Sequence, residues 1–329
     1  MKKTLFLAVT FLAMSANMLA DGLTATLQQG DKMTPFYGID AFKKAYEAAD
    51  SGAVITLSSG QFNTVDSVAK SMTIIGAYAF KVSDPTTTIL SNLNVRANNV
   101  KVEGIYFSGS VSLGAITNCH IKRCWIQLKL SSSAAHTNTL IDQCVVKNDY
   151  AVSKGINYCI KNSTIDYFGA MNTTSNIAYI TNCVVWNWYS SSSNQPYAIY
   201  KNNVLACWES GSRSIEASAY SEFYNNLFIN RYNSTYIFTV TFPSGCINSG
   251  NINDKNYSAY YTTSDKSYPA PQMKAGATAL GQDGTPIGIY GGTGFSEYPS
   301  IPRITSKTID SSTDAGGKLN VKIAVKVEQ

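Results

Sequence analysis

Charged side chains are scarce in this chain of 329 residues, since Asp, Glu, Lys and Arg make up only 14% of it. The formal net charge is +5, which is small for this length. No run of basic residues occurs that would follow a phosphate backbone. The composition therefore predicts no nucleic-acid partner.

Histidine and metal-binding motifs are equally scarce. Only His120 and His136 occur, and neither has the spacing of a metal ligand. HExxH, CxxC and acidic calcium-binding loops are all missing, so we expect no cofactor, and calcium has no supporting motif. We expect His120 to be structural, whereas His136, in the loop-like stretch SSSAAHTN, is the better candidate for a titrating residue.

Long apolar runs are missing except at the N-terminus. Lys2 and Lys3 precede the apolar run 4–13, and small residues follow, which is typical of a secretory signal and too short for a membrane span. We expect cleavage after Ala20, which lowers the net charge from +5 to +3 because two lysines are removed. No Cys follows the run, so the sequence predicts an exported protein (periplasmic, cell-surface or secreted) that is not a lipoprotein and has no membrane span.

A six-residue phrase recurs along the chain. It is VEGIYF, IKRCWI, IDQCVV, IKNSTI, ITNCVV, YKNNVL and FYNNLF, and successive start points differ by 19, 20, 19, 20, 20 and 23 residues. Such a period is typical of a solenoid. Leucine-rich repeats have a similar period, but their Leu pattern is missing, and the phrases are rich in residues that suit strands. We therefore predict an all-β fold, a single-stranded right-handed parallel β-helix whose coils stack about 4.8 Å apart.

The third position of the phrase predicts a sharp corner between two strands of each coil. It holds Gly104, Arg123, Gln143, Asn162, Asn182, Asn202 and Asn225. Asn and Gly tolerate the left-handed backbone that a tight corner needs. We expect these residues to lie in single file, with the Asn amides of the file hydrogen-bonded from coil to coil.

The fourth position of the phrase places three of the seven cysteines in one column. Cys124, Cys144 and Cys183 share it, and the column should point inward, where free Cys behaves as a small hydrophobe. We favour an interior stack, because neighbouring parallel strands rarely offer the dihedral angle of a disulfide. Disulfides remain the alternative, and the other four cysteines lie off the column.

Both ends of the solenoid have their own signals. Residues 21–52 are expected to form an N-terminal cap with an amphipathic helix, in which Ile39, Phe42, Tyr46 and Ala49 have helical spacing. Residues 53–295 should form the β-helix, with PIGIYGG at 286–292 as a last short coil. Residues 296–329 should form a linker and a C-terminal β-hairpin, since alternate residues of KLNVKIAVKVEQ are apolar. The hairpin would cap the open end or form an appendage.

Together, the stretches SGAVITLSSGQF, MTIIGAY, VKVEGIYFSG, PIGIYGG and KLNVKIAVKVEQ, with the NC and NN corners, resemble the pectin-lyase-like superfamily, in particular exported members from Bacteroidetes. The resemblance covers nearly all of the mature chain and implies the β-helix and a polysaccharide or other glycan partner. It implies no single reaction, because relatives include lyases, polygalacturonases, pectin esterases and proteins of no known activity. The catalytic phrases of those enzymes are missing here, so no catalytic residue is carried over.

A row of functional side chains is expected along one flank, nine positions into each coil. It comprises Ser110, Lys129, Asp149, Phe168, Trp188, Trp208 and Arg231, with Tyr150, Tyr189, Glu209 and Tyr232 one residue later. Lys129, Arg231 and Asp149 are the catalytic candidates, because β-elimination of a uronate needs a cation and a base. Trp188, Trp208, Tyr150, Tyr189 and Glu209 are the substrate-binding candidates, because aromatic rings stack on sugars. The same residues would otherwise only cover strand ends.

Two functions follow as hypotheses. The first is a polysaccharide-active enzyme, a uronic-acid lyase rather than a glycoside hydrolase, and the second is a non-catalytic glycan-binding, adhesin or envelope protein. Tyr106 and Trp125 share an outward-facing column on adjacent coils. They would form a second small sugar platform or lie beneath the terminal hairpin.

Overall fold

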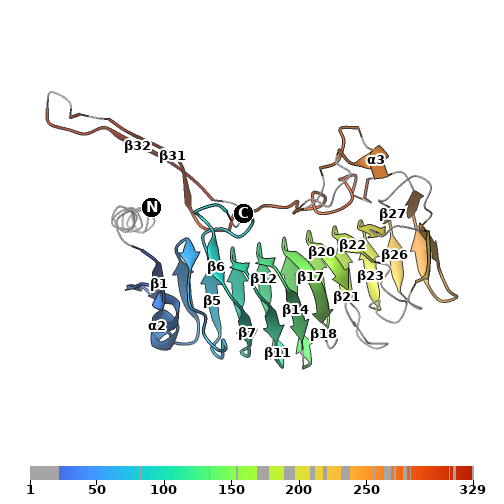
Figure 1. The fold of residues 1–329 in the computed structure, drawn as a ribbon, viewed down its shortest axis with the longest axis horizontal. Coiled ribbons are helices and arrows are strands. Elements are labelled where there is room, and N and C mark those ends of the chain that lie inside the picture. The colour runs from blue at the N-terminus through green and yellow to red at the C-terminus, as the bar shows by residue number, and fades with distance from the viewer. Residues whose placement is uncertain are drawn as a thin grey trace.

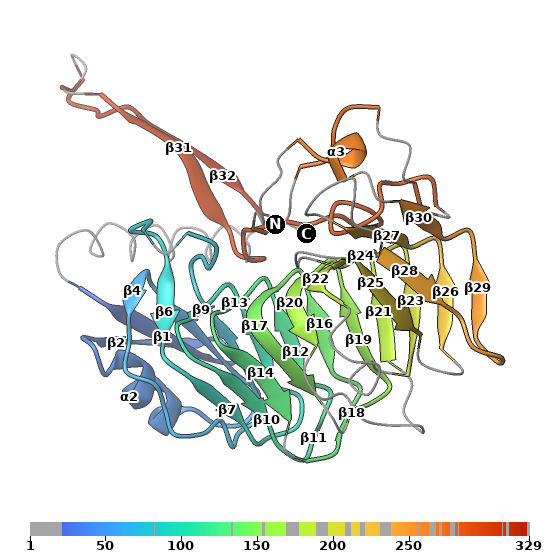
Figure 2. The same cartoon turned by 45° about the vertical axis from the view of Figure 1, so that its right-hand side comes forward.

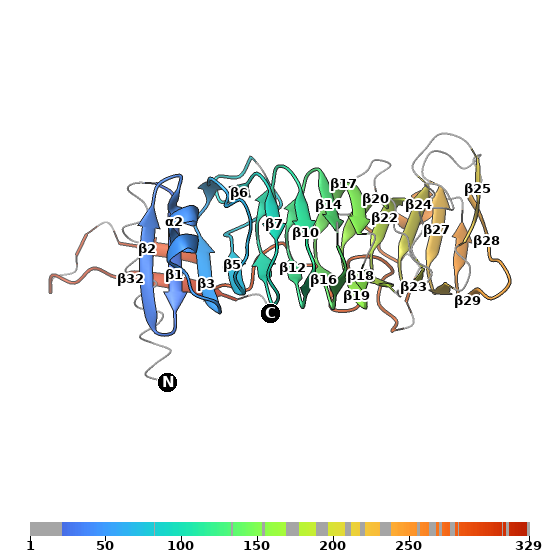
Figure 3. The same ribbon diagram turned by 90° about the horizontal axis from the view of Figure 1, so that it is seen from below.

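The chain forms a parallel β-solenoid of about seven turns, described here from a computed structural model. The described residues are 22–81, 83–132, 134–152, 155–168, 178–188, 197–207, 212–217, 221–230, 238–254, 257–262, 268–269, 272–276, 280–281, 283–310, 312–313 and 316–327. The coils stack in chain order along a rod (Figures 1 and 3). The predicted all-β parallel solenoid is therefore confirmed, whereas the predicted signal peptide at 1–20 lies outside the described residues.

Two long sheets form the walls of the solenoid. Sheet A has the order β2 (Lys32–Tyr37), β1 (Thr24–Gln29), β3 (Ala53–Leu57), β5 (Met72–Ile75), β8 (Lys101–Glu103), β12 (His120–Lys122), β16 (Leu140–Asp142), β19 (Tyr158–Lys161), β21 (Ala178–Thr181), β23 (Ala198–Lys201), β26 (Glu222–Tyr224) and β29 (Ile247–Ser249). Sheet B has the order β30 (Ile252–Asp254), β27 (Leu227–Asn230), β24 (Val204–Cys207), β22 (Val184–Asn187), β20 (Thr164–Phe168), β17 (Val145–Val152), β13 (Trp125–Ile126), β9 (Tyr106–Phe107), β6 (Thr88–Leu90) and β4 (Gly60–Gln61).

Shorter strands complete the cross-section. They are β7 (Leu93–Val95), β10 (Val111–Leu113) and β14 (Lys129–Ser132), which join sheet B through β17, then β11 (Ile116–Thr117), β15 (His136–Thr137) and β18 (Gly155–Ile156), and the pair β25 (Arg213–Glu216) and β28 (Phe238–Thr241). In the coils, neighbouring strands pair in parallel, so residues about 20 apart in the chain lie side by side.

The corner between sheets A and B is the single file that the phrase predicts. Every residue of the file has a positive φ: Gly104 70°, Arg123 49°, Gln143 55°, Asn162 44°, Asn182 52°, Asn202 56° and Asn225 51°. Each backbone N–H donates to a carbonyl of the next coil; that of Asn162, for example, reaches Thr181 O at 3.1 Å. The left-handed corner is therefore confirmed. A second corner, at Asn99, Asn118, Asn138 and Asn157, also has positive φ and was not predicted.

The amide ladder that we expected at the corner lies instead one position later, inside the solenoid. Asn203, Asn226 and Asn251 occupy the fourth position of the phrase, and Asn203 Nδ2 donates to Asn226 Oδ1 at 2.9 Å, as Asn226 Nδ2 does to Asn251 Oδ1 at 3.0 Å. In the earlier coils the same inner column holds Cys124, Cys144 and Cys183, all buried. None of the seven cysteines forms a disulfide, so the interior stack is confirmed and the disulfide alternative is wrong.

The N-terminal end of the solenoid is covered as predicted. Helix α2 (Ala41–Ala48) buries Phe42 and Ala45 against the core, while Ile39 precedes the helix and is exposed. Strands β1 and β2 form an antiparallel ribbon that pairs with β3 and so completes sheet A, a feature that we did not predict.

After the last solenoid strand the chain runs back along the rod. The described parts of residues 257–302, which begin with helix α3 (Tyr257–Tyr260) and which we call the return segment, lie over the outer face of sheet B, where Ile287 and Ile289 pack with Val184, Val204 and Leu227 (Figure 1). The prediction of a last coil at 286–292 is therefore wrong. Gly and small polar residues there allow close contact with the corner file instead of completing a coil, and Asn162 Nδ2 donates to Ile289 O and Gly291 O at 2.9 and 2.8 Å.

The predicted C-terminal hairpin is present, with β31 (Arg303–Ile309) antiparallel to β32 (Val321–Lys326). It projects away from the solenoid near the N-terminal end of the rod and does not cap the C-terminal end (Figures 1 and 2). The reason is the return segment, whose Ser300 is held by Glu103 at 2.8 Å and by Arg123 at 2.9 Å.

We predict that Asn226→Ala lowers the free energy of unfolding by about 3 kcal/mol, because the change leaves several buried backbone and amide groups without partners. Denaturant unfolding measures the effect. The control is Asn248→Ala on the exposed strand β29, which should change the free energy of unfolding by less than about 0.5 kcal/mol. Equal effects of the two changes would contradict the role of the ladder.

Candidate functional site

The flank predicted from the ninth position of each coil does not form as one row. Lys129 lies partly exposed on β14, and its Cα pairs with that of Asp149 on β17. Tyr150 and Trp188, predicted to bind substrate, are 0% and 1% exposed and pack inside the solenoid. Their assignment to an outer surface is therefore wrong. Tyr189, Trp208, Glu209 and Arg231 lie outside the described residues.

A register shift breaks the predicted row. Tyr150 pairs with the buried Leu130 and therefore lies in an inward column, one residue after the column of Lys129. Between Val146 and Asp149, strand β17 slips by one residue relative to β20, so that Phe168 pairs with Tyr150 instead of Asp149. One residue of slip exchanges the two faces of a strand, so Phe168 joins the inward column. The rings of Tyr150 and Phe168 meet there with their centroids 5.7 Å apart, and Trp188 contacts the ring of Tyr200.

The outer face of sheet A presents a different row of functional side chains. The second position of the phrase, directly before the corner file, points outward on each coil. In chain order this column holds Glu103, Lys122, Asp142, Lys161, Thr181, Lys201 and Tyr224, as the strand registers show. Lys122, Lys161 and Lys201, which we call the lysine file, therefore recur on every second coil.

Asp142 is the most enclosed charged group of this face. Its residue is only 4% exposed, and Lys161 Nζ lies 3.5 Å from Asp142 Oδ2. His120 Nε2 lies 3.9 Å from the same oxygen, and Asp142 Oδ1 has no hydrogen-bond partner in the described structure. A carboxylate between an imidazole and an ammonium group provides the parts for proton transfer next to a cation.

The return segment borders the lysine file. Lys122 Nζ lies 3.2 Å from Ser300 Oγ and 4.0 Å from Glu103 Oε1, so this lysine is partly neutralised. Further along, the pKa of Asp283 is lowered. Hydrogen bonds from Thr285 are the main cause, and the nearby charge of Lys201 contributes less. The Lys161 side chain is 34% exposed, against 19% for that of Lys122, and Lys201 is half-buried. These two cations are therefore the accessible part of the file.

An aromatic cluster lies where the return segment meets sheet B. The Trp125 ring is partly exposed and contacts Tyr106 and Phe80, with centroids 6.2 and 6.3 Å apart, and Tyr268 at 5.5 Å. Burial, with the bonded Asp166 carboxylate, raises the pKa of Tyr268. Tyr106 is itself buried, so the predicted Tyr106–Trp125 platform is reduced to Trp125, and it lies beneath the return segment rather than the hairpin.

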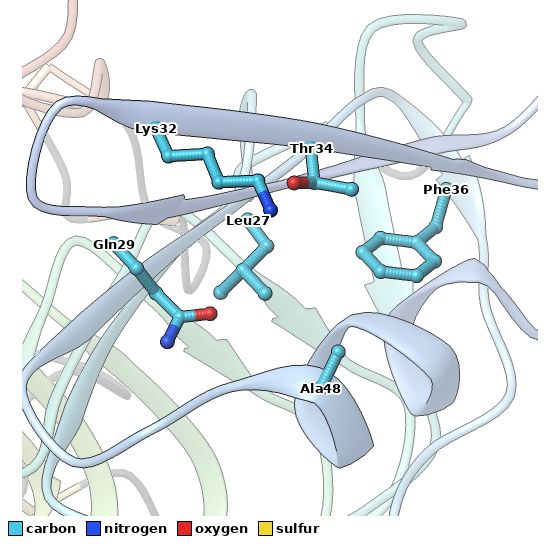
Figure 4. Close-up of a pocket in the computed structure, with 6 residues that line it drawn as sticks. All are labelled: Leu27, Gln29, Lys32, Thr34, Phe36 and Ala48. Atoms are coloured by element: carbon cyan, nitrogen blue, oxygen red, sulfur yellow. The ribbon is translucent and has the colours of Figure 1, made fainter.

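A shallow cavity of about 260 Å³ opens at the N-terminal end, between the β1–β2 ribbon and α2. Its lining combines apolar Leu27, Phe36 and Ala48 with polar Gln29, Lys32 and Thr34 (Figure 4). Lys32 is its single titratable side chain, with no second acid or base beside it in the lining, so we do not assign the function to it.

Within the described ranges, no three His, Cys, Asp or Glu side chains gather as a metal site would require. In the same part of the chain, no helix has the length and hydrophobicity to span a bilayer. Searches against protein-family models, curated proteins and solved structures gave no match.

The lysine file was missed by our sequence analysis, although its signal is visible in the printed phrases. The second letter of IKRCWI, IKNSTI and YKNNVL is Lys in each case, with Asp in the intervening IDQCVV. We followed the ninth position because it is rich in aromatic residues. The second position is the safer guide, since it lies next to the corner that aligns the coils.

His136 is buried on β15, contrary to its predicted place in a loop, with Nδ1 2.8 Å from Thr139 Oγ1. Burial lowers the pKa of His136 from 6.5 to about 4. The unfolded chain therefore binds this proton more tightly, and the stability contributed by neutral His136 is complete above pH 6.5 and is lost as the pH falls towards 4.

We predict that the free energy of unfolding of the wild type falls by about 2 kcal/mol more between pH 7 and pH 4.5 than that of His136→Gln. Denaturant unfolding at the two pH values, for wild type and variant, measures this difference. An unchanged pH dependence in the variant would show that His136 titrates alike in the folded and unfolded chain.

Proposed function

We propose that this exported β-solenoid of the pectin-lyase-like type binds an extended acidic polysaccharide along the outer face of sheet A. The observation that carries the proposal is the lysine file, with cations on every second coil of a regular stack. Two coils span about 9.6 Å along the rod. A linear uronate polymer in which every second sugar presents its carboxylate to the same side has a comparable repeat, so these charges would follow the file.

The face also has the aromatic and polar surface that sugar binding requires. Tyr179, on β21 opposite Cys159, is 42% exposed, and the Tyr224 hydroxyl donates to Glu222 at 2.9 Å. Exposed aromatic rings offer apolar area for stacking on a sugar ring at a low cost in side-chain entropy. The straight axis of the solenoid suits a polymer rather than a single small molecule.

We predict that Lys161→Ala and Lys201→Ala each weaken binding of polygalacturonate about tenfold, because each removes one charge-assisted hydrogen bond of about 1.4 kcal/mol. Isothermal titration or affinity electrophoresis measures the change, and added salt should weaken wild-type binding. Lys129→Ala on β14 is the control and should leave the affinity unchanged.

The outcome distinguishes the two surfaces. Loss of binding in Lys129→Ala but not in Lys161→Ala would move the site to the flank predicted from the ninth positions. Equal binding of polygalacturonate and neutral dextran would contradict recognition by charge.

A second function, cleavage of the same polymer by β-elimination, is favoured by the His120–Asp142–Lys161 group. His120 would take the proton from C5 of the uronate, the C4–O bond would break, and the leaving oxygen would take a proton from solvent water. Lys161 would neutralise the substrate carboxylate during this step. The His120 side chain is 28% exposed, and because its Nε2 is buried beside Asp142, Nδ1 is the nitrogen that would act on a sugar at this face.

We predict that, if the chain is a lyase, ultraviolet absorbance of unsaturated uronate rises with polygalacturonate, alginate or hyaluronan and that His120→Gln abolishes the rise while polymer binding is retained. The paired binding assay makes the result decisive. Binding without any product would leave the chain as the non-catalytic glycan-binding protein proposed first.

A further inference from the structure

The two ends of sheet A differ in how they finish. At the N-terminal end the antiparallel β1–β2 ribbon pairs with β3, and α2 covers the core. At the C-terminal end β29 is the last described strand of the sheet, and its residues are exposed, Ile247 by 50%. Phe242 and Cys246 lie half-buried beneath it. Among the described strands, none continues sheet A beyond β29.

The edge of β29 is able to accept another strand. Ile247 N donates to Ser221 O of the preceding coil, and Ser249 O accepts from Asn225 N. Because alternate residues of a strand bond to opposite neighbours, the N–H and C=O of Asn248 point away from the solenoid. An open edge of this kind is a template for strand addition.

The C-terminal hairpin is the matching element. Its register places Ile304 opposite Val325, Lys307 opposite Ile323 and Ile309 opposite Val321, so one face of the ribbon is apolar apart from Lys307, and Val325 is 53% exposed. A two-stranded ribbon alone is marginally stable in water, and it has two free edges and an uncovered apolar face. It has the same antiparallel form as the β1–β2 ribbon that finishes the other end of sheet A.

The charges of the two elements are opposite. Residues 202–254, which form the last coils, contain four acidic and two basic residues and no lysine, a net charge of −2. Residues 303–327 contain five basic and two acidic residues, a net charge of +3. Electrostatic complementarity of this kind favours and orients an encounter between hairpin and open end.

The hairpin cannot finish the end of its own solenoid. It leaves the rod at Ser300, beside β8 and β12, and β29 lies six strands beyond β12, about 29 Å away. The seven-residue strand β31 spans only about 23 Å. The hairpin also points toward the opposite end of the rod (Figures 1 and 2).

We infer that the β31–β32 hairpin of one chain adds to the open β29 edge of a second copy, with its apolar face over the end of the core. The contact joins two different surfaces of the same chain, so it is head-to-tail and propagates into linear assemblies. Main-chain hydrogen bonds at Asn248 and burial of Val321 and Val325 would stabilise it. The lysine file lies on another face and takes no part.

Each of two full-length variants blocks one of the two contacting surfaces, the β29 edge or the hairpin. Asn248→Pro removes the outward N–H from the acceptor edge while the bonds of Ile247 and Ser249 to the preceding coil remain. Val325→Glu places a charge on the apolar face of the hairpin. Thr308→Glu, on the opposite ribbon face across from Lys322, adds the same charge and is the matched control.

Sedimentation velocity over a range of concentrations tests the inference. Wild type and Thr308→Glu should form species at multiples of the chain mass, whereas Asn248→Pro and Val325→Glu should each sediment as single chains. Mixed together, the two blocked variants should form a pair of twice the chain mass and nothing larger, because one retains the hairpin and the other retains the edge.

Three results would overturn the inference. They are a wild type that stays a single chain at every concentration, either blocked variant assembling as wild type does, or a mixture that fails to pair. Self-association of Asn248→Pro alone would indicate hairpin-to-hairpin contact instead. Circular dichroism checks the fold of each variant, and Ile247→Lys, an exposed change without a backbone effect, replaces Asn248→Pro if that variant unfolds.

Discussion

The left-handed corner between sheets A and B is the constraint on which the rest of the structure depends. A residue with positive φ there turns the backbone sharply, and its N–H bonds to the next coil. Asn and Gly adopt this conformation at low cost, whereas Arg123 and Gln143 do not. Both of the latter are tied into hydrogen bonds: Arg123 Nε donates to Gln143 Oε1 at 2.8 Å, and the same oxygen accepts from Ser296 N. The corner therefore also anchors the return segment.

That anchoring makes the two walls of the rod different. Over sheet B, the return segment buries an outward-facing apolar column that contains Val184 and Val204, and a second core forms outside the solenoid. In the described part of the chain the return segment does not form such a core over sheet A, whose outward columns hold charged, polar and aromatic side chains. The return segment forms a border along the lysine file at Lys122.

Outward-facing positions close to the corner could be predicted from the sequence, whereas positions farther from it could not. The second position of the phrase adjoins the aligned corner, so its side chains stack faithfully, as Lys122, Asp142 and Lys161 do. The ninth position follows a stretch that contains a register shift, and one residue of slip moved Phe168 from the column of Lys129 to the inward column of Leu130 and Tyr150. The six-residue phrase ends before this register shift, so the repeat pattern could not indicate it.

The sequence by itself determined the period, the corner, the inner column of cysteines and the presence of a terminal hairpin, because each is a local pattern repeated or completed within about 20 residues. Only the tertiary structure decided where residues 257–302 run and in which direction the hairpin points. Those outcomes rest on contacts such as Ser300 with Glu103, between residues 197 positions apart, and no local pattern specifies which distant surface a segment will cover.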